Sequence, residues 1–221
     1  IQETSIDQQE RMREAALKTS AATQFSATEA AEAYYFLASA GLNAEEQIGS
    51  LATVAAFAQA GNFDLALATD LLTDAQSALG LSTGTTTQKL ENMTRLGDTL
   101  VKANTLANAS VEQFSTSLTK GAGSAARSVG MDLAQTVAVL AVFADQGIKA
   151  ELAASQFAIV MRDLQTKALG NAAAFKAAGI AVFDEAGEFR NMADIVDDLT
   201  GRLDGMSDAA KKAELLSLGF S

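Results

Sequence analysis

The side chains that could do chemistry in this chain are mainly carboxylates. The densest groups are Asp184, Glu185 and Glu188, and Asp194 with Asp197 and Asp198. A hard cation such as Ca²⁺ takes about six to eight oxygen ligands, so such groups could hold one. Their spacing lacks an EF-hand loop, and a helix would place Asp194 and Asp198 on one face but Asp197 on another. We interpret these groups as a solvated acidic surface and predict no metal ligand.

Nucleophilic and acid–base chemistry lack their usual side chains. The sequence contains no His and no Cys, which removes the common near-neutral base, thiolate ligands and disulfides. The hydroxyls of Ser115, Thr116 and Ser117 therefore have no His partner, and no G-x-S-x-G elbow occurs. The segment 121–123 lacks the G-K-[ST] ending of a phosphate loop. We predict that the chain is not an enzyme and has no catalytic, cofactor-binding or metal-binding residue.

The charge balance argues against DNA binding. The chain carries 16 Lys and Arg against 27 Asp and Glu, a formal net charge of −11. Affinity for DNA depends largely on neutralising phosphates with basic side chains, and Lys211–Lys212 is the only adjacent basic pair. We expect no direct sequence-specific nucleic-acid binding, although an acidic lining could let DNA pass without adhering to it.

The elements that must position these residues are helices. Apolar residues make up 48% of the 221 positions, Pro is absent and Ala, the strongest helix former, is abundant. Ser26-x-x-Glu29 and Asn43-x-x-Glu46 match capping boxes. Helices are predicted over 1–22, 27–40, 44–61, 65–79, 88–107, 111–120, 133–146, 149–168, 171–178, 192–203 and 208–218. The fold class is therefore all-α, a cluster of capped helical hairpins.

Two segments break the helical pattern. The Gly-rich run 121–130 is predicted to be a connection with about one helical turn. In the second segment the apolar period changes over Ile180–Phe183, followed by the turn DEAG and by Glu188–Arg190. Gly187 can supply the positive φ that such a turn requires, so we predict one small β-hairpin near residues 180–190.

The chain divides into two predicted parts. Residues 1–24 form an N-terminal amphipathic helix, interpreted as a linker or a coiled-coil end, and residues 25–221 form a helical domain. Within that domain, residues 26–61 and 132–168 could be a duplicated αα-hairpin, because a shift of 106 aligns Ser26 with Asp132 and Gly41 with Gly147. Any two capped hairpins align about this well, so duplication and chance both stay open.

Several ordered blocks of the chain resemble a known family. The blocks are LATDLLTDAQSALGL, NMTRLGDTLVKANTLANASVEQFSTSLTKGAG, VAVLAVFADQGIKAELAASQFAIVMRDLQTKA, AGIAVFDEAGEFRNMADIVDDL and GMSDAAKKAELLSLGF. Together they resemble the core region of the phage tail tape measure proteins, the tail length determinants, from about Phe25 to Ser221. The first 24 residues match least. This family motif is a packing pattern without catalytic positions, so no functional residue is carried over.

The resemblance implies a structural role in a phage or prophage tail. A tape measure protein sets tail length, scaffolds assembly of the tail tube and is released during DNA ejection. The implied partners are other copies of the chain (a homo-oligomer), the tail tube protein, tail tip or baseplate proteins and tail assembly chaperones. The implied location is the lumen of the virion tail, and the host cytoplasm during assembly. Contact with a membrane would then occur during ejection.

Two other functions remain open. One is a membrane-active helical protein that is stored as a soluble bundle, and the other is a small hydrolase that would have to work with carboxylates alone. No apolar run approaches the roughly 18 residues that a spanning helix needs, and we predict no signal peptide, because the first stretch IQETSIDQQERMREAALK is polar and amphipathic. Because the sequence begins without Met, we interpret it as a fragment of a longer protein.

Overall fold

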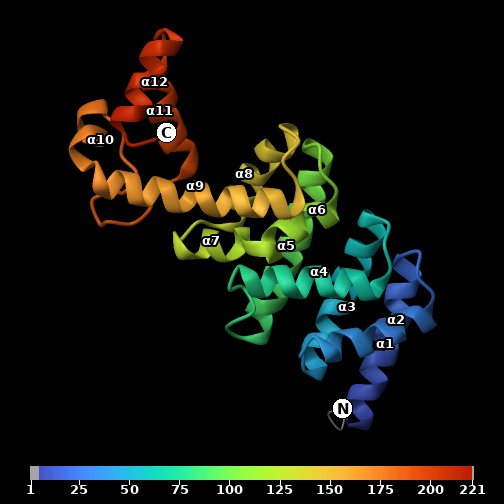
Figure 1. Cartoon of the computed structure of the whole chain (residues 1–221). Helices are drawn as coiled ribbons and strands as arrows, with labels where there is room; N and C mark the ends of the chain where they lie inside the picture. The colour runs from blue at the N-terminus through green and yellow to red at the C-terminus, as the bar shows by residue number, and fades with distance from the viewer. Residues whose placement is uncertain (1–4, 221) are drawn as a thin grey trace.

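The computed structural model describes residues 5–220, and that part of the chain is helical from end to end (Figure 1). The helices of the N-terminal half are α1 (Ile6–Ala22), α2 (Ala27–Ser39), α3 (Ala44–Gly61), α4 (Leu65–Ala78) and α5 (Thr86–Leu106). They are followed by α6 (Val111–Ser117), the π-helical turn η1 (Leu118–Ala122), α7 (Gly123–Ser128), α8 (Leu133–Asp145), α9 (Ala150–Gly170), α10 (Ala172–Ala178), α11 (Met192–Leu203) and α12 (Asp208–Ser217). The all-α class is confirmed.

The molecule is elongated, with the two chain ends at opposite ends (Figure 1). Helices α1 to α3 form one end and α10 to α12 the other, while α5 and α9 run through the middle. No single helix of residues 5–220 is both long and apolar enough to cross a bilayer, but α3 and α4, bent by 108° at their junction, meet that length and composition together.

Short polar side chains fix where the helices begin. Ser26 and Asn43 each accept a hydrogen bond from the backbone N–H three residues on, and the Glu at that position bonds back to the cap. Each box satisfies two of the backbone donors that a helix start leaves unpaired. Asp64, Asp132 and Ser207 also cap helices as the sequence predicts. The predicted first helix begins at Ile6, and residues 1–4 lie outside the described part.

The predicted Gly-rich connection is more helical than expected. Helix α6 continues without a break through η1 into α7, and the non-helical residue inside this run is Gly121, with φ of 139°. A π-helical turn accommodates one extra residue, and Gly can take the positive φ at low cost. The burial of Leu118, Ala122 and Ala126 explains why this segment stays helical despite its glycines.

The predicted β-hairpin near residues 180–190 is wrong, because no strand is assigned anywhere in residues 5–220. What forms is a single antiparallel bridge between Phe183 and Phe189, closed around Gly187 at φ of 82°. The carboxylate of Asp184 accepts hydrogen bonds from the N–H groups of Ala186 and Glu188. The side chain thus pairs turn donors locally, and the bridge is too short to become a ladder of strands.

A single apolar core runs the length of the molecule. It is rich in Ala, which lets neighbouring helices approach closely. The largest side chains with almost no exposure are Phe114, Phe157, Leu37, Leu51, Leu72, Leu96, Leu100, Leu118, Leu140, Met161, Ile195 and Leu218. They come from both halves of the chain, so the core joins the early helices to the late ones.

Helix α1 is attached to the helices that follow it. The hydroxyl of Tyr34 in α2 donates to the backbone carbonyl of Met12 at 2.9 Å, and Arg11 pairs with Glu45 at the start of α3. Burial raises the pKa of Tyr34 to about 12, so its hydroxyl stays protonated and keeps donating at neutral pH. The division of the chain at residues 24 and 25 stays a prediction.

Candidate functional site

Helices α3 and α5 pack extensively against each other, and small side chains make the close approach possible. The Leu90 side chain lies directly over Gly49, where a Cβ atom would come within 2.4 Å of it. Further along, the hydroxyls of Thr53 and Thr94 are 3.0 Å apart. The contacting residue numbers rise together on the two helices, from Gly49 with Leu90 to Thr53 with Thr94, so α3 and α5 run parallel. Because α4 must carry the chain back between them, its length sets the register of the pair.

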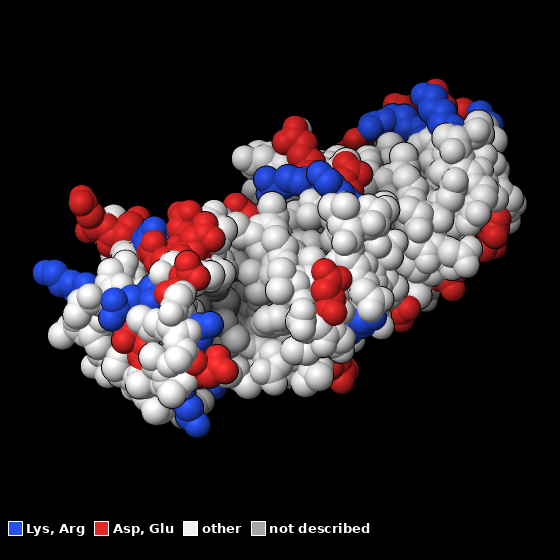
Figure 2. All heavy atoms as spheres, turned by 90° about the horizontal axis from the view of Figure 1, so that it is seen from above, with Lys and Arg blue, Asp and Glu red and all other residues white. Residues whose placement is uncertain are grey.

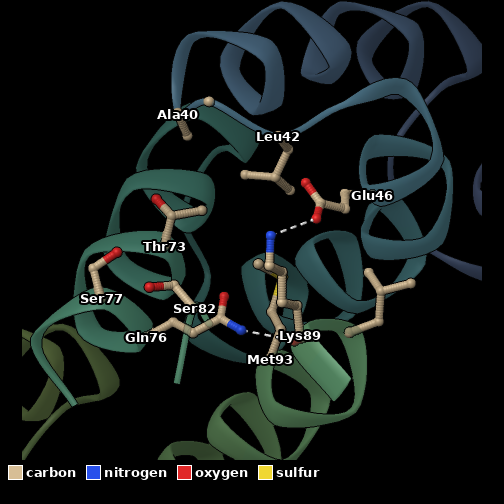
Figure 3. A pocket seen from close by; sticks show the side chains of 11 residues that line it. Ala40, Leu42, Glu46, Thr73, Gln76, Ser77, Ser82, Lys89 and Met93 are labelled. Carbon is tan, nitrogen blue, oxygen red and sulfur yellow. Dashed lines mark hydrogen bonds and ion pairs between the residues drawn. The ribbon is translucent and has the colours of Figure 1, made fainter. Parts of the chain in front are cut away.

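A small polar pocket lies where this pair meets α2 and α4 (Figure 3). Its volume is about 110 Å³. The residues that line it are Ala40, Gly41, Leu42, Glu46, Thr73, Gln76, Ser77, Ser82, Lys89, Leu90 and Met93. Three helices (α3, α4 and α5), the turn after α2 and the loop after α4 therefore contribute to one small space, which makes this pocket a junction between elements.

An ion pair between Glu46 and Lys89 crosses the pocket. The Lys89 Nζ atom lies 2.8 Å from Glu46 Oε1, and the Glu46 side chain is only 8% exposed. Burial by itself raises the pKa of Glu46, but the hydrogen bond from Lys89 and the backbone hydrogen bond from Asn43 outweigh it. The pKa of Glu46 therefore lies below its ordinary value, and the carboxylate stays charged at neutral pH.

Gln76 of α4 completes the junction. Its amide nitrogen donates to the backbone carbonyl of Lys89 at 2.7 Å and to that of Leu81 at 3.2 Å (Figure 3). It thereby fixes the loop between α4 and α5 to the first turns of α5. The Glu46–Lys89 pair and the two hydrogen bonds of Gln76 thus join α3, α4 and α5 at the pocket.

Sequence reasoning missed this junction. The pattern Asn43-x-x-Glu46 predicted the cap of α3 but gave no signal that Glu46 also faces Lys89, which lies 43 positions away in the chain. Gln76 gave no signal either, since a lone Gln on an amphipathic helix is ordinary. Only the packing of α4 between α3 and α5 brings the three side chains together.

The predicted acidic groups do not converge. Asp198 pairs with Arg190 at 2.7 Å, and that hydrogen bond lowers the pKa of Asp198. Asp184 is used within its own turn, and Asp194 and Asp197 are exposed. Within residues 5–220 no three acidic side chains are placed to hold a metal ion. The interpretation as a solvated acidic surface fits this arrangement.

The hydroxyls of residues 115–117 serve packing. Ser117 donates to the carbonyls of Gln113 and Ala150 at 2.9 and 3.0 Å, which ties α6 to the start of α9. The Ser115 hydroxyl is fully buried and has no hydrogen-bond partner. An unpaired buried hydroxyl costs stability, so it is a local defect of the core.

The outer surface is uneven in charge. Figure 2 shows that charged side chains gather at the two ends of this face and along its rim, while its middle is largely uncharged. Large apolar side chains are also exposed, namely Ile6, Leu17, Tyr35, Leu106, Val142, Leu152, Ile159, Leu169, Val196 and Leu216. Exposed apolar side chains indicate an assembly contact only where they form a contiguous patch.

Comparison with known proteins gives two findings. Residues 13–218 match the model of a family described as phage-related minor tail protein. The chain is also similar to the tape measure protein of Pneumococcus phage Dp-1, with 23% identity over 208 residues. This alignment covers 94% of the chain but only 17% of that relative, so the chain spans less than a fifth of its length. No solved structure matches.

Proposed function

We propose a role in the phage tail from the premise that this chain belongs to the family of phage-related minor tail proteins, whose model covers residues 13–218. Membership makes it a structural component of a phage tail, and the resemblance to tape measure proteins is confirmed. The finer proposal is that the chain is one segment of a tape measure protein that sets tail length. The observation that carries it is the match of nearly the whole chain to a named tape measure protein.

The physical properties of the chain support a tape segment. It is elongated and mostly helical, with its ends far apart (Figure 1). A formal charge of −11 disfavours adhesion to DNA, which must pass through the same tail. We therefore propose that the segment scaffolds tail tube assembly, lies in the tube lumen and is released when DNA is ejected.

The proposed partners follow from that location. They are further copies of the chain, the tail tube protein, tail tip or baseplate proteins, and the tail assembly chaperones that accompany the protein in the host cytoplasm. Exposed apolar side chains such as Leu152 and Val196 are available for such contacts. We propose no catalytic role, and the paired polar groups of the pocket support this.

The test of the tape proposal is genetic. Deleting helical segments of increasing length from the parent gene, in frame, should shorten the tail in proportion, at about 1.5 Å per residue for helix. Tail lengths are measured by electron microscopy. Replacing a segment with an unrelated helical sequence of equal length is the matched control and should leave the length unchanged. Tails of constant length in the deletion series would refute the role in length.

The second candidate is a membrane-active helical protein. The bent pair α3–α4 favours it, since together these helices have the length and composition of a membrane span. Dye-filled liposomes distinguish the two proposals. Release of dye on addition of the chain, and its loss when Asp replaces Val54 in the middle of α3, would support membrane activity. Intact liposomes at all protein concentrations would count against it.

A further inference from the structure

Several helices begin or end 106 residues after an earlier helix begins or ends. Residue 27 opens α2 and residue 133 opens α8, a shift of 106, and both helices are 13 residues long. The same shift takes the first residue of α3 to that of α9, and the first residue of α5 to that of α11. It also takes the last residue of α1 to that of α7. The recurrence thus extends from one hairpin to a unit of five elements.

Local geometry repeats with the same shift. At the end of α2 the N–H of Leu42 bonds to the carbonyl of Leu37, and at the end of α8 the N–H of Ile148 bonds to that of Phe143. The glycines before these donors, Gly41 and Gly147, have φ of 87° and 80°. This six-residue closure is a Schellman motif in both places. Corresponding residues can therefore be compared between the two units.

The units differ in what covers their second long helix. In the first unit α5 lies on α3 through three neighbouring contacts: Lys89 on Glu46, Leu90 on Gly49 and Thr94 on Thr53. The positions that correspond on α9 are Leu152, Ser155 and Ile159. They share one helix face, since they lie three and four residues apart.

That face of α9 is open. Leu152 is 54% exposed where its counterpart Glu46 is 6% exposed, and Ile159 is 39% exposed. On α11 the counterparts of Leu90 and Thr94 are open, because Val196 is 49% exposed and Thr200 is exposed, whereas Ile195, the counterpart of Lys89, is buried. Two of the three contact positions of the first unit are thus uncovered on both helices of the second.

Within one chain α11 is held away from this face. Its buried side chains Met192 and Ile195 anchor its first turns, and the Met192 N–H donates to Gln135 of α8 at 3.4 Å. Asp198 is fixed by Arg190. Figure 1 shows α11 and α12 near the C-terminal end of α9, away from its start. Within one chain, Val196 and Thr200 are therefore held away from Ser155 and Ile159.

The charges at corresponding positions of α9 and α11 indicate which helix binds the open face of α9. Ala56 of α3 and Asp98 of α5 line the same groove in the first unit. The positions that correspond to them are Arg162 on α9 and Asp204 at the end of α11, which carry opposite charges. Both are exposed. A helix with the sequence of α11 therefore complements α9 in charge as well as in shape.

We propose that the face of α9 formed by Leu152, Ser155 and Ile159 binds α11 of a second copy of this chain. The two copies exchange equivalent helices, so that Val196 and Thr200 of one copy lie on Ser155 and Ile159 of the other, as Leu90 and Thr94 lie on Gly49 and Thr53. Such an exchange of identical elements gives a closed two-fold contact. This inference rests on the proposed self-association of the tape segment and names the surface that carries it.

Disulfide trapping tests the contact, and the absence of Cys gives a clean background. A Ser155→Cys chain mixed with a Val196→Cys chain should form a mixed disulfide under mild oxidation, because these positions correspond to the touching pair Gly49 and Leu90. The control replaces the second variant with Leu216→Cys, which is equally exposed on α12 and should not cross-link. Mass spectrometry identifies the linked peptides.

Sedimentation velocity gives an independent measurement. Leu152→Glu should raise the dissociation constant of the dimer by about tenfold or more, because the contact would bury an unpaired carboxylate. Leu169→Glu, at a 70% exposed position on the same helix, is the matched control and should leave it unchanged. Circular dichroism checks that both variants fold.

The outcomes of these experiments distinguish a failure of the proposed α9–α11 contact from a failure of self-association itself. A dimer that tolerates Leu152→Glu and yields no mixed disulfide overturns this surface but leaves self-association standing. A disulfide that forms only when both Cys are in one chain shows that α11 covers its own α9 and overturns the exchange. A monomer at every concentration overturns both proposals.

Discussion

Single residues in this protein act mainly by pairing polar groups between helices. The clearest case is Glu46, which caps α3 through Asn43 and also pairs with Lys89 of α5. Removing the cation would leave a carboxylate of 8% exposure without its partner. Buried charges without partners are strongly destabilising, whereas exposed ion pairs contribute little.

Replacing Lys89 with Met should therefore lower the free energy of unfolding by about 1–3 kcal/mol, because Lys89 itself is one-third exposed and water screens part of the loss. Urea denaturation measures the change. Lys18→Met, which breaks the exposed pair with Glu14, is the control and should cost less than about 0.5 kcal/mol. Equal losses in the two variants would contradict the importance of the buried pair.

The same pair makes stability depend on pH. The pKa of Glu46 is lower in the folded protein than its ordinary value of 4.5, so the unfolded chain binds that proton more tightly. The stabilisation is complete above pH 4.5 and is lost as pH falls through the folded pKa. Subtracting the pH profile of Glu46→Gln from that of the native chain should reveal a decline confined to acid. A flat difference would show that Glu46 does not titrate differently on folding.

Replacing Ser115 is expected to stabilise the protein, in contrast to replacing Lys89. Its hydroxyl is buried without a partner, so Ser115→Ala should raise the free energy of unfolding by about 1 kcal/mol. Thermal and urea denaturation both measure it. Ser117→Ala is the matched control, because that hydroxyl donates two hydrogen bonds and its loss should destabilise. Destabilisation by Ser115→Ala would mean that its hydroxyl has a partner after all.

At the scale of elements, the helices are positioned by small residues as much as by large ones. Gly97 lies inside α5, and a Cβ there would meet Phe57 at 3.6 Å, an ordinary contact distance. Gly121 lies in the π-helical turn with φ of 139°, which L residues rarely adopt. Two glycines in helical runs thus have different roles.

Substitution by Ala should separate them. Gly97→Ala should stabilise the protein by about 0.5–1 kcal/mol, because Ala loses less backbone entropy and finds room beside Phe57. Gly121→Ala should destabilise it by about 1 kcal/mol or more through backbone strain, although the space around it is open. Melting temperatures rank the two variants against the native chain. The reverse ranking would contradict the described geometry of η1.

Element length also explains why the two halves differ. Helix α4 has 14 residues and carries the chain back along α3, so α5 starts beside the start of α3. Helix α10, in the corresponding place, has 7 residues and is followed by the bridge at Phe183 and Phe189. Because α10 is shorter than α4, the chain reaches α11 at the far end of α9. The open face of α9 is thus a consequence of where one helix ends.

At the scale of the whole molecule, the excess of 11 negative charges opposes compaction. Salt screens repulsion between exposed charges, so raising NaCl from low to physiological concentration should raise the melting temperature by a few degrees. Differential scanning fluorimetry measures it, with sucrose of equal osmolality as the control. A melting temperature that falls with salt would show that surface ion pairs outweigh the net repulsion.

The sequence by itself determined the helices and their beginnings. Capping at Ser26, Asn43 and Asp132 depends on side chains that reach backbone groups only three residues away, so the pattern of residue types is sufficient. The net negative charge and the lack of His and Cys likewise limit the kinds of chemistry that the chain can perform, and both are properties of the sequence. The family resemblance came from ordered blocks of residues, which are also a property of the sequence.

Only the tertiary structure decided what those helices touch. The Glu46–Lys89 pair and the helical course of 118–128 both depend on packing between segments distant in the chain. The open faces of α9 and α11 depend on it too, since Leu152 and Val196 read in sequence as ordinary core residues. Local patterns fix backbone conformation within a turn or two, whereas burial depends on which helix arrives beside which, and that is set by the whole chain at once.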